Sequence, residues 1–356
     1  MRLVRNIFLL GLVLVTLASC SKDEDEALSA PASAKLTIGI KASGTATKAD
    51  DTNELLGEAN INNLAVVVFS EDGTQLLGSL WQATPGKERT AIIADVPAKA
   101  TRARIIVLAN IPQEVVTSTT SYEDLYSRMA DLSVQEQTNL TMSSPVITTT
   151  NPLNEGDNYL GYEGVTNVNG LSAPLLLTRL TARVDVVNIS ATFAGTPLAG
   201  RSVRIDDIAV YAQKNKSRYF SSSDWGAVEL PGNLSNSDAT PLQDAIVRQG
   251  EPLSGRSYAH YVMENMTEST HTRIAIKATL LATDALKEQT KLFTAEINTN
   301  GLVSGYDHSY IKRNYVYRLR LGFDGTSFED PENSTALSVA VEVVGWGPVN
   351  QAPVIE

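Results

Sequence analysis

The run Tyr315-Val316-Tyr317-Arg318-Leu319-Arg320-Leu321-Gly322-Phe323 decides the fold, because every second side chain in it is large and apolar. The positions between them carry one valine, two arginines and a glycine. Successive side chains of an extended chain point to opposite faces, so this period of two places the apolar set against a core. The run therefore predicts a half-buried antiparallel strand.

The same alternation recurs in both directions from this run. It is found at Leu180/Ala182/Val184/Val186, Ile274/Ile276/Ala278/Leu280, Phe293/Ala295/Ile297 and Leu337/Val339/Val341/Val343. Shorter apolar segments at residues 64–69 and 104–109 predict fully buried strands, and Glu71-Asp72-Gly73 predicts a turn after the first of them. Most of the chain is therefore expected to be β-strand.

Only one stretch of the sequence predicts a helix. Ser121 can cap it, Asp124 follows three residues later, and Leu125, Met129 and Leu132 recur at helical spacing. Strands without regular helical crossovers are typical of sandwiches rather than of a doubly wound sheet. The predicted fold class is all-β, with minor helix.

The length of 356 residues favours two domains, since single cores rarely grow beyond about 250 residues. A polar, glycine-bearing stretch at residues 151–172 interrupts the strand pattern. We place the domains at residues 34–172 and 173–356. The formal net charge of −11 repels phosphate backbones and argues against nucleic acid as a partner.

Residues 1–20 have the layout of a signal peptide, with Arg2 and Arg5 before a short apolar run. Leu17-Ala18-Ser19-Cys20 has the form of a lipobox, in which the cysteine sulfur is acylated before cleavage. The alternative is an ordinary secretory signal with a chance cysteine. The apolar run is shorter than the about 20 residues that a spanning helix needs, so we expect an anchor at Cys20, followed by an acidic linker at residues 21–33.

Motifs of catalysis are not found in the sequence. The three histidines form no HExxH pattern, and no GxSxG elbow, Walker loop or GxGxxG segment is present, so we expect no enzyme, no cofactor and no metal. Asp206-Asp207 and Glu329-Asp330 are possible acid/base pairs, but a β-bulge and a solvated turn explain them more simply. Trp81, Trp225 and Trp346 either stack on sugars or, more simply, belong to the core.

Several short motifs, in this order and spacing, resemble the fimbrillin family of Bacteroidales, the lipoprotein-derived type V pilins. They are Thr47-Lys48-Ala49, Ile61-Asn62-Asn63-Leu64-Ala65-Val66-Val67-Val68-Phe69, Leu180-Thr181-Ala182-Arg183-Val184, Tyr261-Val262-Met263-Glu264-Asn265, Lys312-Arg313-Asn314-Tyr315-Val316-Tyr317 and a terminal strand ending near Trp346. The resemblance implies two transthyretin-like β-sandwiches. It also implies a surface-exposed lipoprotein of the outer membrane, held by acylated Cys20, and the acidic residues 21–26 resemble the export signal of such lipoproteins.

The resemblance further implies assembly by strand exchange, in which an Arg- or Lys-specific protease removes the first strand. The candidate strand is residues 34–42, with Leu36, Ile38 and Ile40 on one face, and the candidate cut lies between Lys48 and Ala49. An uncut linker in an anchor-type subunit is the alternative. The donor is expected from the C-terminal end, at Val339, Val341, Val343, Val349, Val354 and Ile355.

The function expected from these residues is that of a structural pilus subunit that polymerises with copies of itself or with related fimbrial subunits. A tip or accessory adhesin with a host or bacterial surface ligand is the second hypothesis. A base anchor that keeps its lipid and first strand is the third. An enzyme ranks last, because no candidate site was found.

Overall fold

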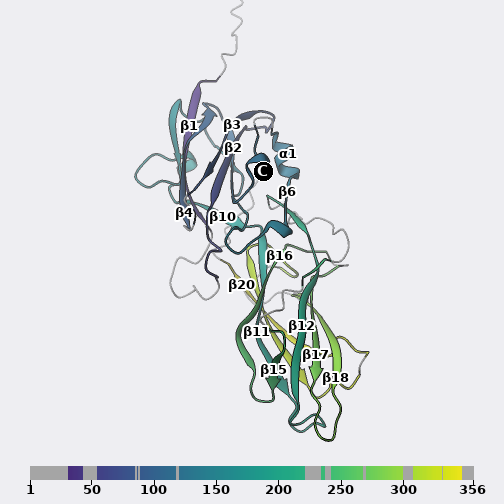
Figure 1. Cartoon of the computed structure of the whole chain (residues 1–356). Helices are drawn as coiled ribbons and strands as arrows, with labels where there is room; N and C mark the ends of the chain where they lie inside the picture. Colours follow the sequence, from purple (N-terminus) through teal and green to yellow (C-terminus); the bar gives the residue numbers. More distant parts are fainter. Residues whose placement is uncertain are drawn as a thin grey trace, which may run out of the picture. The chain divides into compact units, whose positions relative to one another are not determined.

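A computed structural model of the chain describes two β-sandwiches, one formed by the N-terminal and one by the C-terminal half of the sequence (Figure 1). The described residues are 31–42, 54–84, 86, 89–117, 120–220, 234–236, 242–267, 270–299, 308–330 and 332–346. Within them, no helix has the length and apolar character needed to cross a membrane. The prediction of an all-β fold with minor helix is confirmed.

The first sandwich consists of nine strands in one hydrogen-bonded order, β3-β2-β5-β7-β10-β1-β4, with β8 on β5 and β9 on β1. Their bounds are β1 Ser33–Ala42, β2 Asn63–Ser70, β3 Leu76–Ala83, β4 Thr90–Lys99, β5 Ala103–Ala109, β7 Met142–Ser143, β8 Ile147–Thr148, β9 Gly156–Leu160 and β10 Leu175–Arg179. The sheet curls so that its two end strands, β3 and β4, come into contact, and Gly78 of β3 packs against the Pro97 carbonyl of β4. The apolar face of β1 is enclosed in the resulting core.

The turn between β2 and β3 forms where the sequence predicts it. Asp72 Oδ1 accepts hydrogen bonds from the Ser70 hydroxyl and from the Thr74 N–H and hydroxyl, and Gly73 has a φ of 78°. A short acidic side chain that binds its own backbone, followed by a residue free to adopt positive φ, is a strong turn signal.

Helix α1, Tyr122–Ser127, is capped by Ser121 as predicted, since the Ser121 hydroxyl accepts from the Asp124 N–H. It ends earlier than the sequence suggested, because Arg128 is extended. Met129 lies in strand β6, Met129–Asp131, which pairs with β13, Lys216–Arg218. Leu132 begins the short 3₁₀ turn η2, Leu132–Val134; the described 3₁₀ turns also include η1 Gln113–Val115 and η3 Val168–Gly170.

The second sandwich packs the sheet β16-β11-β19-β20 against a sheet of order β14-β12-β17-β18, with β15 on β12. The bounds are β11 Thr181–Thr192, β12 Ser202–Gln213, β14 Leu234–Asn236, β15 Ala245–Arg248, β16 Leu253–Met263, β17 Arg273–Leu280, β18 Gln289–Glu296, β19 Tyr315–Asp324 and β20 Ser338–Gly345. The predicted run at Tyr315 is β19, and its alternate side chains are buried. The prediction of an antiparallel strand holds only for its pairing with β20, since β19 runs parallel to β11.

The apolar run that begins at Leu175 is divided at Leu180 into two strands. β10 pairs with β1 and β7 in the first sandwich, whereas β11 pairs with β16 and β19 in the second. The chain therefore changes sandwich between Arg179 and Thr181, a few residues beyond residue 172, where we placed the boundary. Of the two carboxylate pairs, Asp206 lies at a register shift of β12, and Glu329 and Asp330 are exposed at the end of a turn.

Candidate functional site: the first strand and the acidic segment that follows it

Strand β1 lies inside the sheet of the first sandwich, with hydrogen-bonded neighbours on both edges. β4 pairs with it antiparallel along one edge, from Ser33↔Lys99 to Lys41↔Thr90. Along the other edge, β9 pairs in parallel with its first half and β10 with its last three residues. Removing β1 would therefore leave open ladders on both sides of the gap.

The inward face of β1 is fully buried. Leu36, Ile38 and Ile40 are at most 1% exposed, and Ala34 and Ala42 accompany them in the core. Burial of a large aliphatic side chain contributes about 1.5–3 kcal/mol, so the three large residues contribute on the order of 5–9 kcal/mol. The predicted strand is thus a major part of its own core.

The outer face of β1 is crossed by a loop at Gly39. A Cβ atom on Gly39 would lie 2.4 Å from the Gly161 carbonyl oxygen, and Gly161 itself has a φ of 79°. Only glycine fits this close approach. A strand that takes the place of β1 with this loop unmoved must therefore also present glycine at this position.

The linker that carries the predicted cleavage site begins and ends at ordered contacts. Lys48 and Ala49 lie outside the described residues, as does Cys20. On one side of the linker, the Ala42 N–H donates to the Arg89 carbonyl at 2.8 Å. On the other side, Glu54 forms ion pairs with Arg89 and Arg179.

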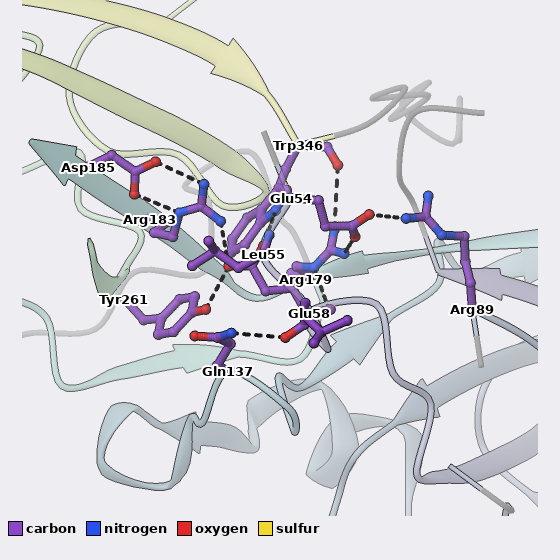
Figure 2. A network of polar contacts seen from close by, with 11 residues as sticks. Glu54, Leu55, Glu58, Arg89, Gln137, Arg179, Arg183, Asp185, Tyr261 and Trp346 are labelled. Carbon is purple, nitrogen blue, oxygen red and sulfur yellow. Dashed lines mark hydrogen bonds and ion pairs between the residues drawn. The ribbon is translucent and has the colours of Figure 1, made fainter. Parts of the chain in front are cut away.

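Residues 54–58 supply two carboxylates to a buried network (Figure 2). Glu58 is 0% exposed. One of its oxygens accepts from Arg183 at 2.5 Å and from the Tyr261 hydroxyl at 2.6 Å, and the other accepts from the Trp346 indole at 3.0 Å. One side chain that precedes β2 thereby joins β11, β16 and the residue that follows β20.

The charges in the network balance. Three guanidinium groups, of Arg89, Arg179 and Arg183, face the carboxylates of Glu54, Glu58 and Asp185. Asp185 holds Arg183 through two hydrogen bonds, of 2.7 and 2.9 Å. Buried charges of this kind are tolerated because each has a partner of opposite sign.

Burial affects the arginines of the network differently. It lowers the pKa of Arg179 to about 10, although the charge of Glu58 opposes this shift. Burial also disfavours the charge on Arg183, but Asp185 and Glu58 outweigh it and raise the pKa of Arg183 above its ordinary value. Both guanidinium groups are therefore charged at neutral pH. The Trp346 ring lies against them, with its centroid 4.6 Å from the guanidinium carbon of Arg179 and 5.2 Å from that of Arg183.

Comparison with known proteins identifies both halves of the chain. Residues 32–179 match the family model described as "Major fimbrial subunit protein (FimA)", and residues 180–346 match "Fimbrium tip subunit Fim1C-like, C-terminal domain". A protein named "Putative fimbrium tip subunit Fim1C", from Parabacteroides distasonis, is 54% identical over the whole length of both chains. The chain belongs to the FimA/Fim1C family of fimbrial subunits.

Solved structures agree with this family. A Parabacteroides distasonis protein, crystallised as a "putative cell adhesion protein", is 54% identical with a TM-score of 0.79, and the match covers 89% of this chain and 98% of that one. The fimbrilin of Porphyromonas gingivalis W83 shares the fold, with a TM-score of 0.64 at 18% identity over 89% and 99% of the two chains. The predicted resemblance to the fimbrillins is confirmed.

Two of the motifs that carried the resemblance meet in the second sandwich of this fimbrial subunit. Arg313 donates to Glu264 through its Nε at 3.0 Å, and the Ser217 hydroxyl donates to the same carboxylate at 2.9 Å. Arg313 and Glu264 are each 1% exposed. These motif residues therefore form a buried structural cluster.

The valines predicted to donate a strand lie in two places. Val339, Val341 and Val343 belong to β20, which pairs antiparallel with β19 of the same chain, and they pack against the core of their own sandwich. In this structure they complete their own domain, and their donation to a neighbouring subunit stays a prediction. Val349, Val354 and Ile355 lie outside the described residues.

Two of the three tryptophans that were candidates for sugar stacking have structural surroundings. Trp346 is buried in the network, and the Trp81 indole donates to the Ile111 carbonyl, while Trp225 lies outside the described residues. Among the side chains that the structure describes, no three His, Cys, Asp or Glu residues come together as a metal-binding group. Sequence reasoning missed Glu54 and Glu58. The available signal was the pair Arg179 and Arg183, which stand among the apolar residues of β10 and β11.

Proposed function

We propose that this fimbrial subunit enters its fibre through the site that β1 occupies, after a cut in the linker frees β1 and a strand of another subunit replaces it. The observation that carries the proposal is the position of β1, which fills the middle of a sheet and is connected to the rest of the chain through residues 43–53. An incoming strand restores both ladders and refills the apolar sites. A head-to-tail contact of this kind extends into a filament rather than closing on itself.

Lys48 is the proposed cut site, between the small, polar residues that follow β1 and the buried network that begins at Glu54. An Arg- or Lys-specific protease is the partner that this residue requires. Before the cut, acylated Cys20 would hold the subunit in the outer membrane, on the cell surface, with residues 21–33 as a spacer. Cleavage after Lys48 would separate the folded body from this anchor.

Within the fibre, we place the subunit at the tip, in line with the name of its 54% identical relative. The C-terminal residues also favour this position. β1 carries five apolar side chains at alternate positions around Gly39, whereas residues 347–356, Gly-Pro-Val-Asn-Gln-Ala-Pro-Val-Ile-Glu, contain two prolines and no such alternation. A tip subunit accepts a strand and has no further neighbour to donate to. There it would support adhesion to a host or bacterial surface ligand.

A stalk subunit is the second candidate, because the first sandwich matches the major-subunit family and because Val349, Val354 and Ile355 supply some apolar character to the last residues. In that case residues 347–356 are the donor. Deleting them would leave folded subunits that end a fibre but do not extend it.

The test uses fibres sheared from cells that produce the subunit. N-terminal sequencing of the incorporated chain should give Ala49, and a Lys48→Ala variant should remain out of the fibre while a Lys35→Ala control enters normally. Immunogold labelling should mark fibre ends for a tip subunit and the whole length for a stalk subunit. Incorporated chains that still begin at acylated Cys20 would overturn the exchange proposal and indicate an anchor.

A further inference from the structure

A cavity of about 470 Å³ opens beside the end of β1 that the proposed cut would release. Its walls include Ile40 of β1, Ile61, Gln82 at the end of β3, Ile92 of β4, and Tyr162. A volume of this size accommodates one or two large side chains or a small ligand. The walls are mainly apolar, with the Gln82 amide at the edge of β3.

The most unusual wall residue is Ile92, which is 55% exposed. It lies opposite Gly39 in the β1–β4 register, at the position where β1 itself has no side chain. The next pair, Ile40↔Ala91, includes the last large apolar residue of β1 that faces the core, and only Ala42 follows it on that face. The cavity therefore adjoins the second half of β1, at Gly39 and Ile40, two residues before the strand ends at Ala42.

Cutting the linker does not by itself release β1. The buried side chains and the ladders with β4, β9 and β10 remain after the Lys48–Ala49 bond is broken. Spontaneous loss of the whole strand would expose all of these groups at once, and it would be slow. Stepwise displacement avoids this cost, provided that the incoming strand has a place to bind while β1 is still present.

We propose that the cavity lined by Ile40, Ile61, Ile92 and Tyr162 is the first docking point of the replacing strand. Its occupant is an apolar side chain on an extended segment of a neighbouring fimbrial subunit. Docking begins at the end freed by the cut, and displacement of β1 then proceeds from Ala42 toward Ser33. The inference rests on the proposed exchange of β1 and adds its starting point and direction.

The single cysteine of the chain allows a direct test, because Cys20 precedes β1 and stays with it after the cut. The chain is produced from Cys20 onward without acylation and carries a fluorophore on that thiol. All variants also carry Lys22→Arg, so that a lysine-specific protease does not separate the label from β1. Mass spectrometry verifies the single cut after Lys48. Release of the labelled strand is then followed by fluorescence anisotropy, with a peptide of residues 33–42 as the competing strand.

We expect the label to stay bound without peptide and to leave at a rate that rises with peptide concentration. Ile92→Ala should slow this peptide-dependent release about tenfold, since docking then buries less apolar surface. Tyr162→Ala should slow it as well. Leu292→Ala is the matched control, because Leu292 is 53% exposed on β18 of the other sandwich, and it should leave the rate unchanged.

Each other outcome is informative. A release rate independent of peptide concentration would show that β1 leaves spontaneously and would overturn the docking point. An Ile92→Ala release rate equal to that of the protein without this substitution would also overturn it. A label that never leaves at any peptide concentration would instead overturn the proposed exchange itself.

Discussion

Two strands of this subunit lie next to the segments implicated in assembly, and they differ in how firmly each is held. β1 has hydrogen-bonded neighbours on both edges, and its large apolar side chains are at most 1% exposed. β20 pairs with β19 on one edge, and of its inward-facing valines Val343 is buried, whereas Val339 and Val341 are half-buried. The proposed exchange thus involves the better packed of the two strands.

This difference explains why exchange would need both a cut and a substitute. Domains are stable by only about 5–15 kcal/mol, and the three large side chains of β1 contribute on the order of 5–9 kcal/mol. A first sandwich without β1 is therefore close to unfolding until another strand takes its place. In the proposed mechanism, this packing would protect the uncut subunit from premature assembly.

Glu58 provides the strongest test of whether the sandwich that contains β1 and the sandwich that contains β20 are independent in stability. Glu58 follows the linker after β1, and it accepts a hydrogen bond from the Trp346 indole directly after β20. Glu58→Ala should therefore weaken the packing of both sandwiches. Removing one member of a buried ion pair leaves an unpaired charge, and we expect a loss of about 3–5 kcal/mol in the free energy of unfolding. Denaturant unfolding measures the loss, and hydrogen exchange shows where it occurs.

Glu329→Ala is the matched control, because Glu329 is exposed in a turn of the second sandwich. It should change the unfolding free energy little. Hydrogen exchange in Glu58→Ala should rise in β2, β11 and β20 together. A rise confined to one sandwich would show that the network does not couple the two regions.

A pair of truncations sharpens the comparison between β1 and β20 themselves. Ile38→Ala removes a fully buried side chain and should cost about 2–5 kcal/mol, whereas Val341→Ala removes a half-buried one and should cost about 1 kcal/mol. Thermal and denaturant unfolding of both variants measure the difference. Equal losses would contradict the view that β1 is the more firmly packed strand.

The sequence predicted the strands well because their signal is local. Alternation located β19 and β20, and Leu36, Ile38 and Ile40 located β1, while Ser121 and Asp124 located the start of α1. The division at Leu180 was missed, since β10 and β11 form one continuous apolar pattern. The break becomes visible only when the partners are known, because the Leu180 N–H donates to the Thr141 carbonyl between the two strands.

The network of Glu54 and Glu58 could not be predicted for a different reason. Its partners lie far apart in the chain: Arg183 is 125 residues from Glu58, and Trp346 is 288 residues away. Periodicity shows which face a side chain occupies but does not identify the residue that it meets there. A buried arginine requires a partner of opposite charge, but its position in a strand does not show which residue that partner is.

The smallest expected effect comes from two similar turns, one in each sandwich. Hydrogen bonds from Ser70 and Thr74 lower the pKa of Asp72 to about 2, and hydrogen bonds from Thr326 and Ser327 lower the pKa of Asp324. A carboxyl group with a lowered pKa in the folded state stabilises that state above its unfolded pKa, near 4, and this contribution is lost as pH falls through the folded value. Asp72→Asn should therefore reduce stability slightly at pH 7, and its difference from the unmodified protein should shrink between about pH 4 and pH 2.

Hydrogen exchange should place this effect in the first sandwich, and that of Asp324→Asn in the second. If either substitution acted on both sandwiches, the two regions would be coupled through more than the Glu58 network.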